Sequence, residues 1–291
     1  MDVAVVVVNW KSGKRLGRLL DSLLPLAGEL ESVVVVDNAS NDASSLQPPA
    51  SRLPLDWLGL PENRGFAGGA NLGIRRTRSR WVVLLNPDIV AESESIRRLV
   101  SRAEAHPRAG LLCGPLLDEQ GIPQSKFQLR RFPSWKSVLA DVLFLDELRG
   151  LFGKPPLGTL TLDRSERDCP QQIEQPAAAY WLLRRKSWEQ LGGFDENFHP
   201  AWFEDVDFCK RLSQSGWQIL FCSDCPAHHQ GGYSLETLGH SQFLSIYHRN
   251  LLLYLKKHHP RAYPWLWLPV RIGDWVRQVR ASFEARRTGR D

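Results

Sequence analysis

Two short apolar runs rich in β-branched residues place the strongest constraint on the fold of this chain. The first run, Val3 to Trp10, stops at a polar break, and the second, Val33 to Val36, stops at Asp37. Between them, Arg15 to Leu26 carries its apolar residues at the spacing of one helix face. A strand, a helix and a second fully apolar strand predict an α/β fold whose parallel sheet is buried on both faces.

Polar residues follow the ends of three expected strands. Asn9 and Asp37 end the first two, and a third, Trp81 to Leu85, leads into Asn86 and Asp88. Ligands of parallel sheets collect at the carboxyl ends of the strands, where these side chains would meet. Carboxylate and amide oxygens suit Mg²⁺ or Mn²⁺ held together with substrate phosphates. The residues alone leave two plainer interpretations open, an Asx turn at Asp37 and a simple Asn-Pro-Asp turn.

A glycine-rich segment precedes the third strand. Residues 62 to 73 read Glu-Asn-Arg-Gly-Phe-Ala-Gly-Gly-Ala-Asn-Leu-Gly, and their glycines would let backbone N–H groups approach an anion at a helix start. No Gly-Lys-Ser/Thr follows, so the segment is not a Walker A loop, and its spacing does not match a dinucleotide-binding fingerprint. An ordinary glycine turn is the alternative.

Three carboxylates crowd the start of a further expected helix. Glu204, Asp205 and Asp207 follow an aromatic run, where the positive end of a helix dipole can hold an ionised carboxylate. Such a group is poised to act as a general base. An expected strand, 177 to 184, and a short helix, 186 to 191, deliver the preceding Gly-Gly-Phe-Asp-Glu turn to the same place. The alternative is structural, with Asp205 as an N-cap and the other two as solvated first-turn acids.

The order and spacing of these pieces resemble those of the inverting glycosyltransferases of family 2, and within that family the rhamnosyltransferase-like branch. The similarity spans most of the chain, and it implies the GT-A fold, a Rossmann-like nucleotide-binding half with a mostly parallel central sheet flanked by helices. Its marks are Val-Val-Asn-Trp at 7 to 10, Val-Asp-Asn-Ala-Ser at 36 to 40, Asn63-x-Gly65-Phe66-Ala67-x-Gly69-x-Asn71-x-Gly73, Leu85-Asn86-Pro87-Asp88, Gly192-Gly193-Phe194-Asp195-Glu196, Glu204-Asp205-Val206-Asp207, His229-x-x-Gly232-x-Ser234 and Arg249-Asn250.

The resemblance also implies roles for individual residues. Asp205 matches the catalytic base, with Glu204 and Asp207 in support, and Asp37 matches a contact to the nucleotide base. Asp88 matches the last acid of the family's metal-binding Asp-x-Asp, and His229 matches a histidine near the diphosphate and the metal. The other residues implied to bind the nucleotide sugar are Asn9, Asn63, Arg64, Gly65, Asn71 and Asn86. Asn86 departs from the Asp-x-Asp pattern, since an amide is a neutral and weaker ligand.

The implied reaction is an inverting transfer of a sugar from a nucleoside diphosphate to a hydroxyl group, with Mg²⁺ or Mn²⁺ as the cofactor. Inversion needs one base to take the acceptor proton while a cation stabilises the leaving diphosphate, and Asp205 and Asp88 fit those roles. The branch suggests deoxythymidine-diphosphate rhamnose as the donor and a saccharide or lipid-linked glycan as the acceptor.

Two other functions stay open at this point. A nucleotidyltransferase that makes nucleotide sugars would share the nucleotide-binding half, although residues 9 to 14 match its phosphate loop poorly. An inactive relative that only binds a nucleotide sugar is the other, and the presence of both Asp88 and Asp205 argues against it.

Composition fits one enzyme domain, 1 to 255, followed by a tail, 256 to 291. The 291 residues are 43% hydrophobic, enough to bury a large core. Five cysteines, an odd number, and the lack of a recognisable signal peptide favour a reduced, cytoplasmic setting. Cys222 and Cys225 with His228 and His229 allow a zinc interpretation, which a single cysteine pair makes weak.

The net charge of +5 is concentrated in the tail. From 256 to 291, nine Lys or Arg stand against three acids, so this segment carries +6 and the rest of the chain −1. Trp265, Trp267 and Trp275 are interleaved, which suits an anionic membrane surface, and we expect peripheral binding at the inner face of the cell membrane. Nucleic acid ranks lower because the body is not basic and carries no nucleic-acid motif. The alternative packs Trp265 and Trp267 into the core.

Two loops and one further helix complete the expectations. Residues 47 to 60 and 153 to 176, rich in proline or in charged residues, predict loops. Residues 135 to 152 carry apolar residues at helical spacing. They predict a packing helix or, as the sharper alternative, a helix that faces the acceptor or a membrane.

Overall fold

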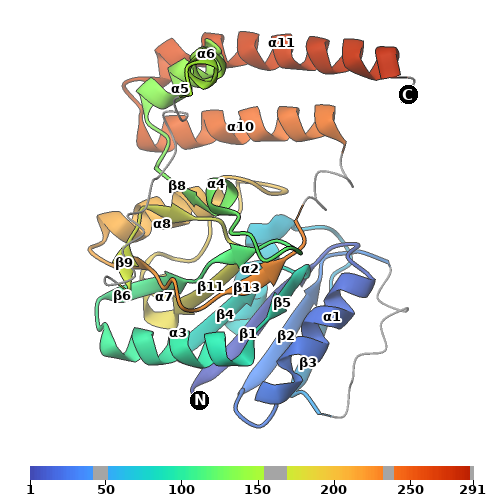
Figure 1. Cartoon of the computed structure of the whole chain (residues 1–291), viewed down its shortest axis with the longest axis vertical. Helices are drawn as coiled ribbons and strands as arrows, with labels where there is room; N and C mark the ends of the chain where they lie inside the picture. Colours follow the sequence, from blue (N-terminus) through green and yellow to red (C-terminus); the bar gives the residue numbers. More distant parts are fainter. Residues whose placement is uncertain (42–51, 154–168, 232–238, 289–291) are drawn as a thin grey trace.

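The computed structural model describes residues 1–41, 52–153, 169–231 and 239–288, and its centre is an eight-stranded sheet (Figure 1). The strand order is β3 (Leu55–Gly59), β2 (Ser32–Asp37), β1 (Val3–Asn9), β4 (Trp81–Leu85), β11 (Tyr180–Arg184), β6 (Ala109–Cys113), β12 (Gln218–Phe221) and β9 (Gln171–Gln172). β1 pairs in parallel with β2 and β4, as do β2 with β3 and β6 with β12. β11 and β9 run antiparallel to their neighbours. The mostly parallel sheet expected from the sequence is confirmed.

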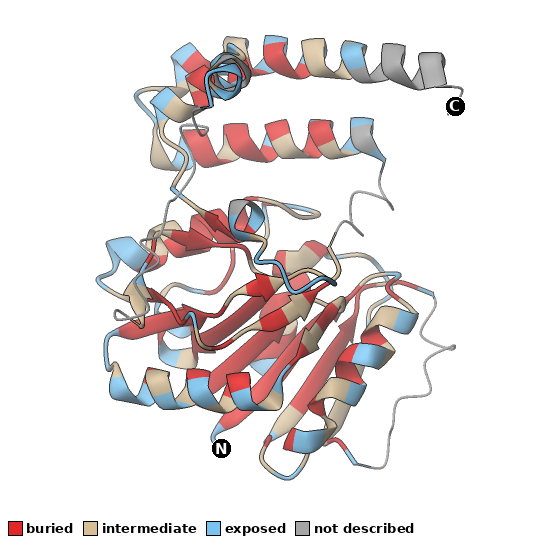
Figure 2. Ribbon diagram, in the orientation of Figure 1, coloured by how far each residue is buried: buried red, intermediate tan, exposed pale blue. Residues whose placement is uncertain are grey.

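Helices cover both faces of this sheet because its strands are apolar on both sides. The first face carries α1 (Lys14–Leu23), η1 (Leu24–Leu26) and α3 (Ser93–Ala105), and the second carries α2 (Gly65–Arg76), α7 (Arg185–Gln190) and α8 (Glu204–Gln214). Every residue of β1 is buried, in keeping with the buried central strands in Figure 2. Alternate side chains divide between the two cores, Val5 on the first face and Val6 on the second.

Two small sheets follow the carboxyl ends of the main strands. One consists of β5 (Ile89–Ala91), β13 (Ala227–His229) and β7 (Leu116–Leu117), and the other pairs β8 (Leu129–Arg130), which follows the short helix α4 (Ser125–Gln128), with β10 (Gln175–Pro176). His229 is the register partner of Ile89. This pairing brings the turn after β4 next to the segment after β12.

A layer of helices lies over one end of the sheet domain (Figure 1). It contains α10 (His240–His258) and α11 (Tyr263–Thr288), which pack along each other, together with α5 (Trp135–Val142) and α6 (Leu145–Leu151). A third apolar core joins this layer to the sheet domain, since Phe203 and Val206 pack with Leu251, Leu255 and Val270. The layer is therefore attached where α8 begins.

The two loop predictions are partly wrong. Residues 55–59 form β3, because they pair in parallel with the outer edge of β2. Residues 171–172 form β9 and residues 175–176 form β10. Residues 47–51 and 154–168 lie outside the described residues, and the remaining described residues of the two loops form neither helix nor strand. The boundary at 255/256 falls inside α10, and α11 begins only at Tyr263.

The tryptophans of α11 face outward. Trp265 is 82% exposed, Trp275 66% and Trp267 45%, whereas Leu266 and Val270 on the same helix are buried. The alternative in which Trp265 and Trp267 pack into the core is therefore wrong. In the described parts of the chain, no helix combines the length and the apolar character needed to cross a bilayer.

Candidate active site

The carboxyl ends of β1 and β2 hold a buried polar pair. Asn9 and Asp37 are register partners, and Asn9 Nδ2 donates to Asp37 Oδ1 over 2.8 Å. The Ser40 hydroxyl also donates to Asp37 Oδ1, and the Ser12 hydroxyl donates to Asn9 Oδ1. No described residue hydrogen-bonds Oδ2 of Asp37, so that oxygen can accept an N–H from a nucleotide base. Asn9 is fully buried, and its amide orients the Asp37 carboxylate.

The glycines of the segment 62–73 bring α2 close to the sheet. A Cβ at Gly69 would lie 2.7 Å from Val8 Cγ1, and a Cβ at Gly73 would clash with Val6 Cγ1. Both contacts are with strand β1, so any side chain at these two positions would push the helix away from the sheet. Close packing of helix on strand therefore explains these glycines, which the sequence had suggested as part of an anion site or a turn.

The turn before α2 lies against the segment that leads to α8. Gly65 has a φ of +70°, and a Cβ there would lie 2.7 Å from the Pro200 carbonyl oxygen. Its N–H donates to Asn63 Oδ1, and the next N–H donates to the same Pro200 oxygen. Arg64 donates to Glu196 over 3.3 Å. Since they are already bonded inside the protein, the N–H groups of Gly65 and Phe66 are not available to an anion.

Asn71 uses its full hydrogen-bonding capacity inside the protein. Its Nδ2 donates to the Phe194 carbonyl and to Glu196 Oε1, both over 2.9 Å. Its Oδ1 accepts from the Phe194 N–H and from Trp188 Nε1. A side-chain amide has two donor and two acceptor positions, and all four are occupied. Asn71 therefore holds the Gly-Gly-Phe-Asp-Glu turn in place, and its amide has no free hydrogen-bonding position in this structure.

Asp88 and His229 face each other beyond the ends of β4 and β12. His229 Nε2 lies 3.5 Å from Asp88 Oδ2, and the two side chains are only 5% and 10% exposed. Gln124 fixes the tautomer of the ring: its Nε2 donates to the His229 carbonyl over 2.9 Å, which leaves its Oε1 to accept from Nδ1 over 2.8 Å. The ring proton therefore lies on Nδ1, and the lone pair of Nε2 points toward the carboxylate.

This pair fits a divalent cation. Burial lowers the pKa of His229, although the Asp88 carboxylate acts to raise it, so the imidazole is neutral at neutral pH. A neutral nitrogen and a carboxylate oxygen are both lone-pair donors, and a cation between them relieves their repulsion. Among the described residues, no group of three or more His, Cys, Asp or Glu side chains could hold a metal ion. The remaining ligands would have to come from a diphosphate and from water.

A cavity of about 640 Å³ opens beside both strand-end groups. It is lined by Ser12, Lys14, Arg15, Arg18, Glu119, Gln230 and Gly231. Ser12 contacts Asn9, and the Gln230 N–H donates to the Asp88 carbonyl over 3.2 Å. Three basic side chains near the start of α1 favour an anionic ligand at this place.

A short segment before β11 connects the Asn86–Asp88 turn to the acids of α8. The Asn86 N–H donates to the Ala179 carbonyl over 3.0 Å. Gln175 Nε2 lies 3.5 Å from Asp205 Oδ2, and the Ala178 N–H also bonds to the Asp205 carboxylate. Residues 175–179 therefore bring the candidate metal turn and the candidate base to neighbouring positions.

All three acids of the first turn of α8 are buried. The helix begins at Glu204 after Phe203 as its N-cap, so the alternatives with Asp205 as the N-cap and with two solvated acids are wrong. Trp202 and Phe203 have φ values of +72° and +75°, a conformation that costs a residue with a side chain about 1–2 kcal/mol.

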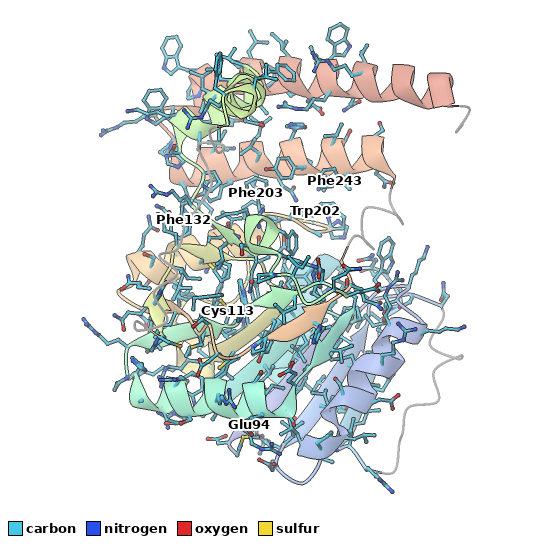
Figure 3. The ribbon with its side chains drawn as sticks, in the orientation of Figure 1. Glu94, Cys113, Phe132, Trp202, Phe203 and Phe243 are labelled. Atoms are coloured by element: carbon cyan, nitrogen blue, oxygen red, sulfur yellow. The ribbon has the colours of Figure 1, made fainter. Side chains whose placement is uncertain are left out.

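Helix α10 holds this strained entry to α8. Asn250 Nδ2 donates to the carbonyls of Ala201 and Trp202 over 2.9 and 3.0 Å. The Trp202 ring lies 4.8 Å from the Phe243 ring, and Figure 3 shows Trp202 and Phe203 between the sheet domain and α10. The Arg249-Asn250 pair of the sequence motif therefore acts on the segment that positions Asp205.

The carboxyl groups of Glu204 and Asp205 are buried side by side, and little positive charge lies near them. Arg130 Nη2 lies 3.7 Å from Asp205 Oδ2, and the Val206 N–H donates to Asp205 Oδ1 over 2.8 Å. Glu204 Oε2 is buried and has no hydrogen-bond partner among the described residues. Burial raises the pKa of both carboxyl groups, most strongly that of Glu204, where the charge of Asp205 adds to the effect. Arg130 acts to lower both pKa values, and Glu204 has the larger rise, so Asp205 is the first of the two to ionise as the pH increases.

Asp207 has the opposite environment. Its side chain is 0% exposed, and its carboxylate accepts from Arg211 Nε over 2.7 Å and from His258 Nε2 and Lys257 Nζ over 2.8 Å each. Burial acts to raise the pKa of Asp207, but these three donors outweigh it and hold the pKa below its ordinary value. Asp207 therefore links α8 to α10 as a paired carboxylate.

Reasoning from the sequence missed the residues that orient the site. Gln124 contacts His229 across 105 positions of sequence, and Gln175 contacts Asp205 across 30. Gln124 and Arg130 lie on either side of α4, so the short segment from 124 to 130 contacts both His229 and Asp205. No local pattern marks any of them, because each acts on a distant partner.

Sheet order, strand-end acids and the carboxylates of α8 define a GT-A glycosyltransferase architecture. The sequence model of "Glycosyl transferase family 2" matches residues 4–156, more than half of the chain, and the chain belongs to this family. It is similar to N-acetylglucosaminyl-diphospho-decaprenol L-rhamnosyltransferase of Mycobacterium tuberculosis, with 28% identity over 88% of this chain and 84% of that protein. The low-salt glycan biosynthesis hexosyltransferase Agl10 of Haloferax volcanii is 23% identical over 78% of this chain and 67% of its own length.

Solved structures share the fold. TarS 1-349 of S. aureus matches 88% of this chain and 66% of its own, with a TM-score of 0.56 and 18% identity. The mannosyltransferase PcManGT from Pyrobaculum calidifontis matches 97% of this chain and 73% of its own, with a TM-score of 0.58 and 17% identity. These likenesses concern the fold alone, and they confirm the GT-A fold expected from the motifs.

Proposed function

We propose that this chain is an inverting glycosyltransferase that moves a sugar from a nucleoside diphosphate to a hydroxyl of a saccharide or lipid-linked glycan. The observation that carries the proposal is the buried Asp205 carboxylate, which has a raised pKa and lies next to the turn that holds Asp88. Rhamnose from deoxythymidine-diphosphate rhamnose is the first donor to test, because the mycobacterial relative is named a rhamnosyltransferase.

Asp205 takes the role of the base. It accepts the proton of the acceptor hydroxyl while that oxygen bonds to the anomeric carbon and the bond to the diphosphate breaks on the opposite face. A base with a raised pKa is better matched to this task at neutral pH than an ordinary carboxylate. Gln175 and Arg130 orient the carboxylate, and the strongly raised pKa of Glu204 beside it disfavours a second charge there.

On the donor side, Asp37 would accept from the nucleotide base and Asp88 with His229 would hold Mg²⁺ or Mn²⁺. The cation would neutralise charge on the leaving diphosphate. Gln124 supports this role, since it keeps the lone pair of His229 Nε2 directed at the site. The basic cavity beside Ser12 supports a place for the diphosphate. Solved complexes of PcManGT and of GalNAc-T7 contain Mn²⁺, which gives Mn²⁺ as the first ion to try.

The chain would act at the inner face of the cell membrane without spanning it. Most of the exposed large apolar side chains of the described residues lie on the helical layer and its turns: Trp135, Leu143, Leu145, Leu151, Phe152, Trp265, Trp267, Leu268, Ile272 and Trp275. An apolar surface of this kind beside basic residues suits the lipid headgroup region. A lipid-linked acceptor, as in the name of the mycobacterial relative, would be met there.

The test is a screen of the purified chain against nucleotide sugars with Mn²⁺, Mg²⁺ or EDTA, in which release of nucleoside diphosphate is measured with and without a lipid-linked acceptor. We expect one donor to be consumed much faster than the others, with dependence on the metal and on the acceptor. The Asp205→Asn variant serves as the control for contaminating enzymes. If no donor is turned over although one binds, the chain is an inactive relative and the proposal is wrong.

A further inference from the structure

Helices α10 and α11 enclose a groove that the chemistry at Asp205 does not use. Its volume is about 370 Å³. The residues that line it are Arg249, Leu252, Leu253 and Lys256 of α10 and Tyr263, Trp267 and Arg271 of α11. On each helix these residues recur every three or four positions, so each helix turns one face to the groove.

Charge and apolar surface alternate in this groove. Arg249, Lys256 and Arg271 are exposed. Lys256 and Arg271 have no hydrogen bond or ion pair with any described residue. The side chains between them, Leu252 and Trp267 among them, are apolar. Basic side chains in an otherwise apolar groove complement an amphiphile that has an anionic head and a hydrocarbon chain.

The position of the groove indicates which kind of ligand it would bind. The Arg249 guanidinium donates to the His199 carbonyl, and His199 begins the segment that leads to Asp205. On the other side, Trp267 is 45% exposed and adjoins Leu268 and Ile272, which are 56% and 53% exposed. The groove therefore reaches from the segment before the base to the exposed apolar surface of α11.

We propose that this groove binds the diphosphate and the first isoprene units of a prenyl-diphosphate-linked acceptor. Arg249, Lys256 and Arg271 contact the diphosphate, and Tyr263 and Trp267 contact the chain. The inference rests on the proposed function in one respect, that the acceptor is lipid-linked. In this proposal the two diphosphate groups occupy different places. The diphosphate of the acceptor lies between α10 and α11, and the diphosphate of the donor lies at the strand ends.

The experiment measures binding of farnesyl diphosphate to the full chain in a neutral detergent by calorimetry, with farnesyl monophosphate and farnesol as comparisons. We expect the diphosphate to bind tightest and farnesol weakest. Lys256→Glu and Arg271→Glu should each weaken diphosphate binding about tenfold, because each replaces a charge-assisted contact by repulsion. The matched control is Arg261→Glu, an exposed residue of the turn between the two helices that does not line the groove. It should change binding by less than about twofold.

Two results would overturn the inference. One is equal binding of farnesol and farnesyl diphosphate, or equal weakening by all three substitutions. The other is loss of binding to phosphatidylglycerol vesicles in the groove variants with unchanged binding of farnesyl diphosphate, which would assign the cations to lipid headgroups. Thermal unfolding of each variant checks that the helical layer is intact, and Arg271→Gln repeats the test without charge reversal. Since the probe contains no sugar, the outcome does not depend on whether the chain transfers one.

Discussion

The strand ends and the helical layer satisfy their polar groups in opposite ways. At the strand ends, Asn9, Asp37 and His229 are buried and bonded to other protein groups. In the groove between α10 and α11, Lys256 and Arg271 are exposed and have no partner among the described residues. The first region is preorganised for a reaction, and the second gains its partners from a ligand. Substitutions in the first should alter chemistry, and substitutions in the second should alter binding.

The largest expected effect is at the base. Asp205→Asn keeps the size of the side chain and removes its basicity, so turnover should fall by roughly two to four orders of magnitude. Donor affinity, measured by calorimetry, should stay within about twofold because Asp205 serves the acceptor. Glu204→Gln is the matched control: if Glu204 is already protonated, this variant should lose less than about tenfold in turnover. A loss in Glu204→Gln as large as that in Asp205→Asn would contradict the assignment of Asp205 as the single base.

Asp207 lies in the same turn of α8 as Glu204 and Asp205, but its carboxylate is paired with basic side chains, and this difference can be tested. Asp207→Asn leaves Arg211, His258 and Lys257 without their shared carboxylate, and the free energy of unfolding should fall by about 3 kcal/mol. The folded-state pKa of Asp207 lies below the reference 3.8, so its contribution to stability is complete above that pH and is lost as the pH falls through the folded pKa. Denaturant titrations at neutral and acid pH measure both effects. Glu94→Gln, in an exposed ion pair of α3, should not change stability measurably.

The metal site is tested by donor affinity with Mn²⁺ and with EDTA. Asp88→Ala should abolish the metal-dependent part of donor binding, and His229→Ala should weaken it. Gln124→Leu removes the acceptor for His229 Nδ1–H and should weaken metal affinity about 10- to 100-fold. The control is Glu92→Gln, which alters the exposed contact with His228 and should leave the metal affinity unchanged. Donor affinity that ignores EDTA in the unaltered chain would contradict the site.

The pH profile of kcat/KM reports the ionisation of the buried carboxyl pair, Glu204 and Asp205. Because burial raises the pKa of Asp205, activity should rise about tenfold per pH unit up to an apparent pKa above that of an ordinary aspartate. Arg130 acts to lower this pKa, so Arg130→Gln should move the acid limb to higher pH. If the acid limb of the profile stayed in place in Arg130→Gln, or moved to lower pH, the result would contradict the proposed effect of Arg130 on Asp205.

The smallest expected effect is at the membrane. The full chain should co-sediment with phosphatidylglycerol vesicles at low salt, and a chain truncated after His259 should not. Since truncation also removes buried Leu266 and Val270, Trp265→Ser with Trp275→Ser is the cleaner variant and should weaken binding about fivefold. Binding that is the same for all three proteins, or insensitive to salt and to lipid charge, would exclude the tail as an anchor.

Periodicity and strand-end chemistry were sufficient to predict the sheet. The valines of β1 and β2 are buried on both faces, so their pattern leaves few alternatives. β3 could not be predicted in the same way, because it is an edge strand of half-buried residues, in which pairing with β2 outweighs local composition.

The candidate site was predictable where its residues stand in contiguous motifs, and not where their role depends on partners far away in the sequence. Asp205 and Asp88 stand in contiguous motifs, and the structure brings them to neighbouring positions. Asn71 stands in such a motif too, yet its amide is used up by partners more than 100 residues away in the sequence. Gln124 has no motif, and its role depends on the orientation of one backbone carbonyl. Hydrogen bonds over such separations follow from tertiary packing, which no local pattern encodes.

The measurement that tests the central claim most directly is the configuration of the anomeric carbon during transfer, followed by NMR through its one-bond carbon–hydrogen coupling with the preferred donor of the screen. If Asp205 activates the acceptor for a single displacement, the product forms with inverted configuration from its first appearance, and Asp205→Asn forms no product on the same timescale. A product with the configuration of the donor would contradict the single displacement and with it the role of Asp205.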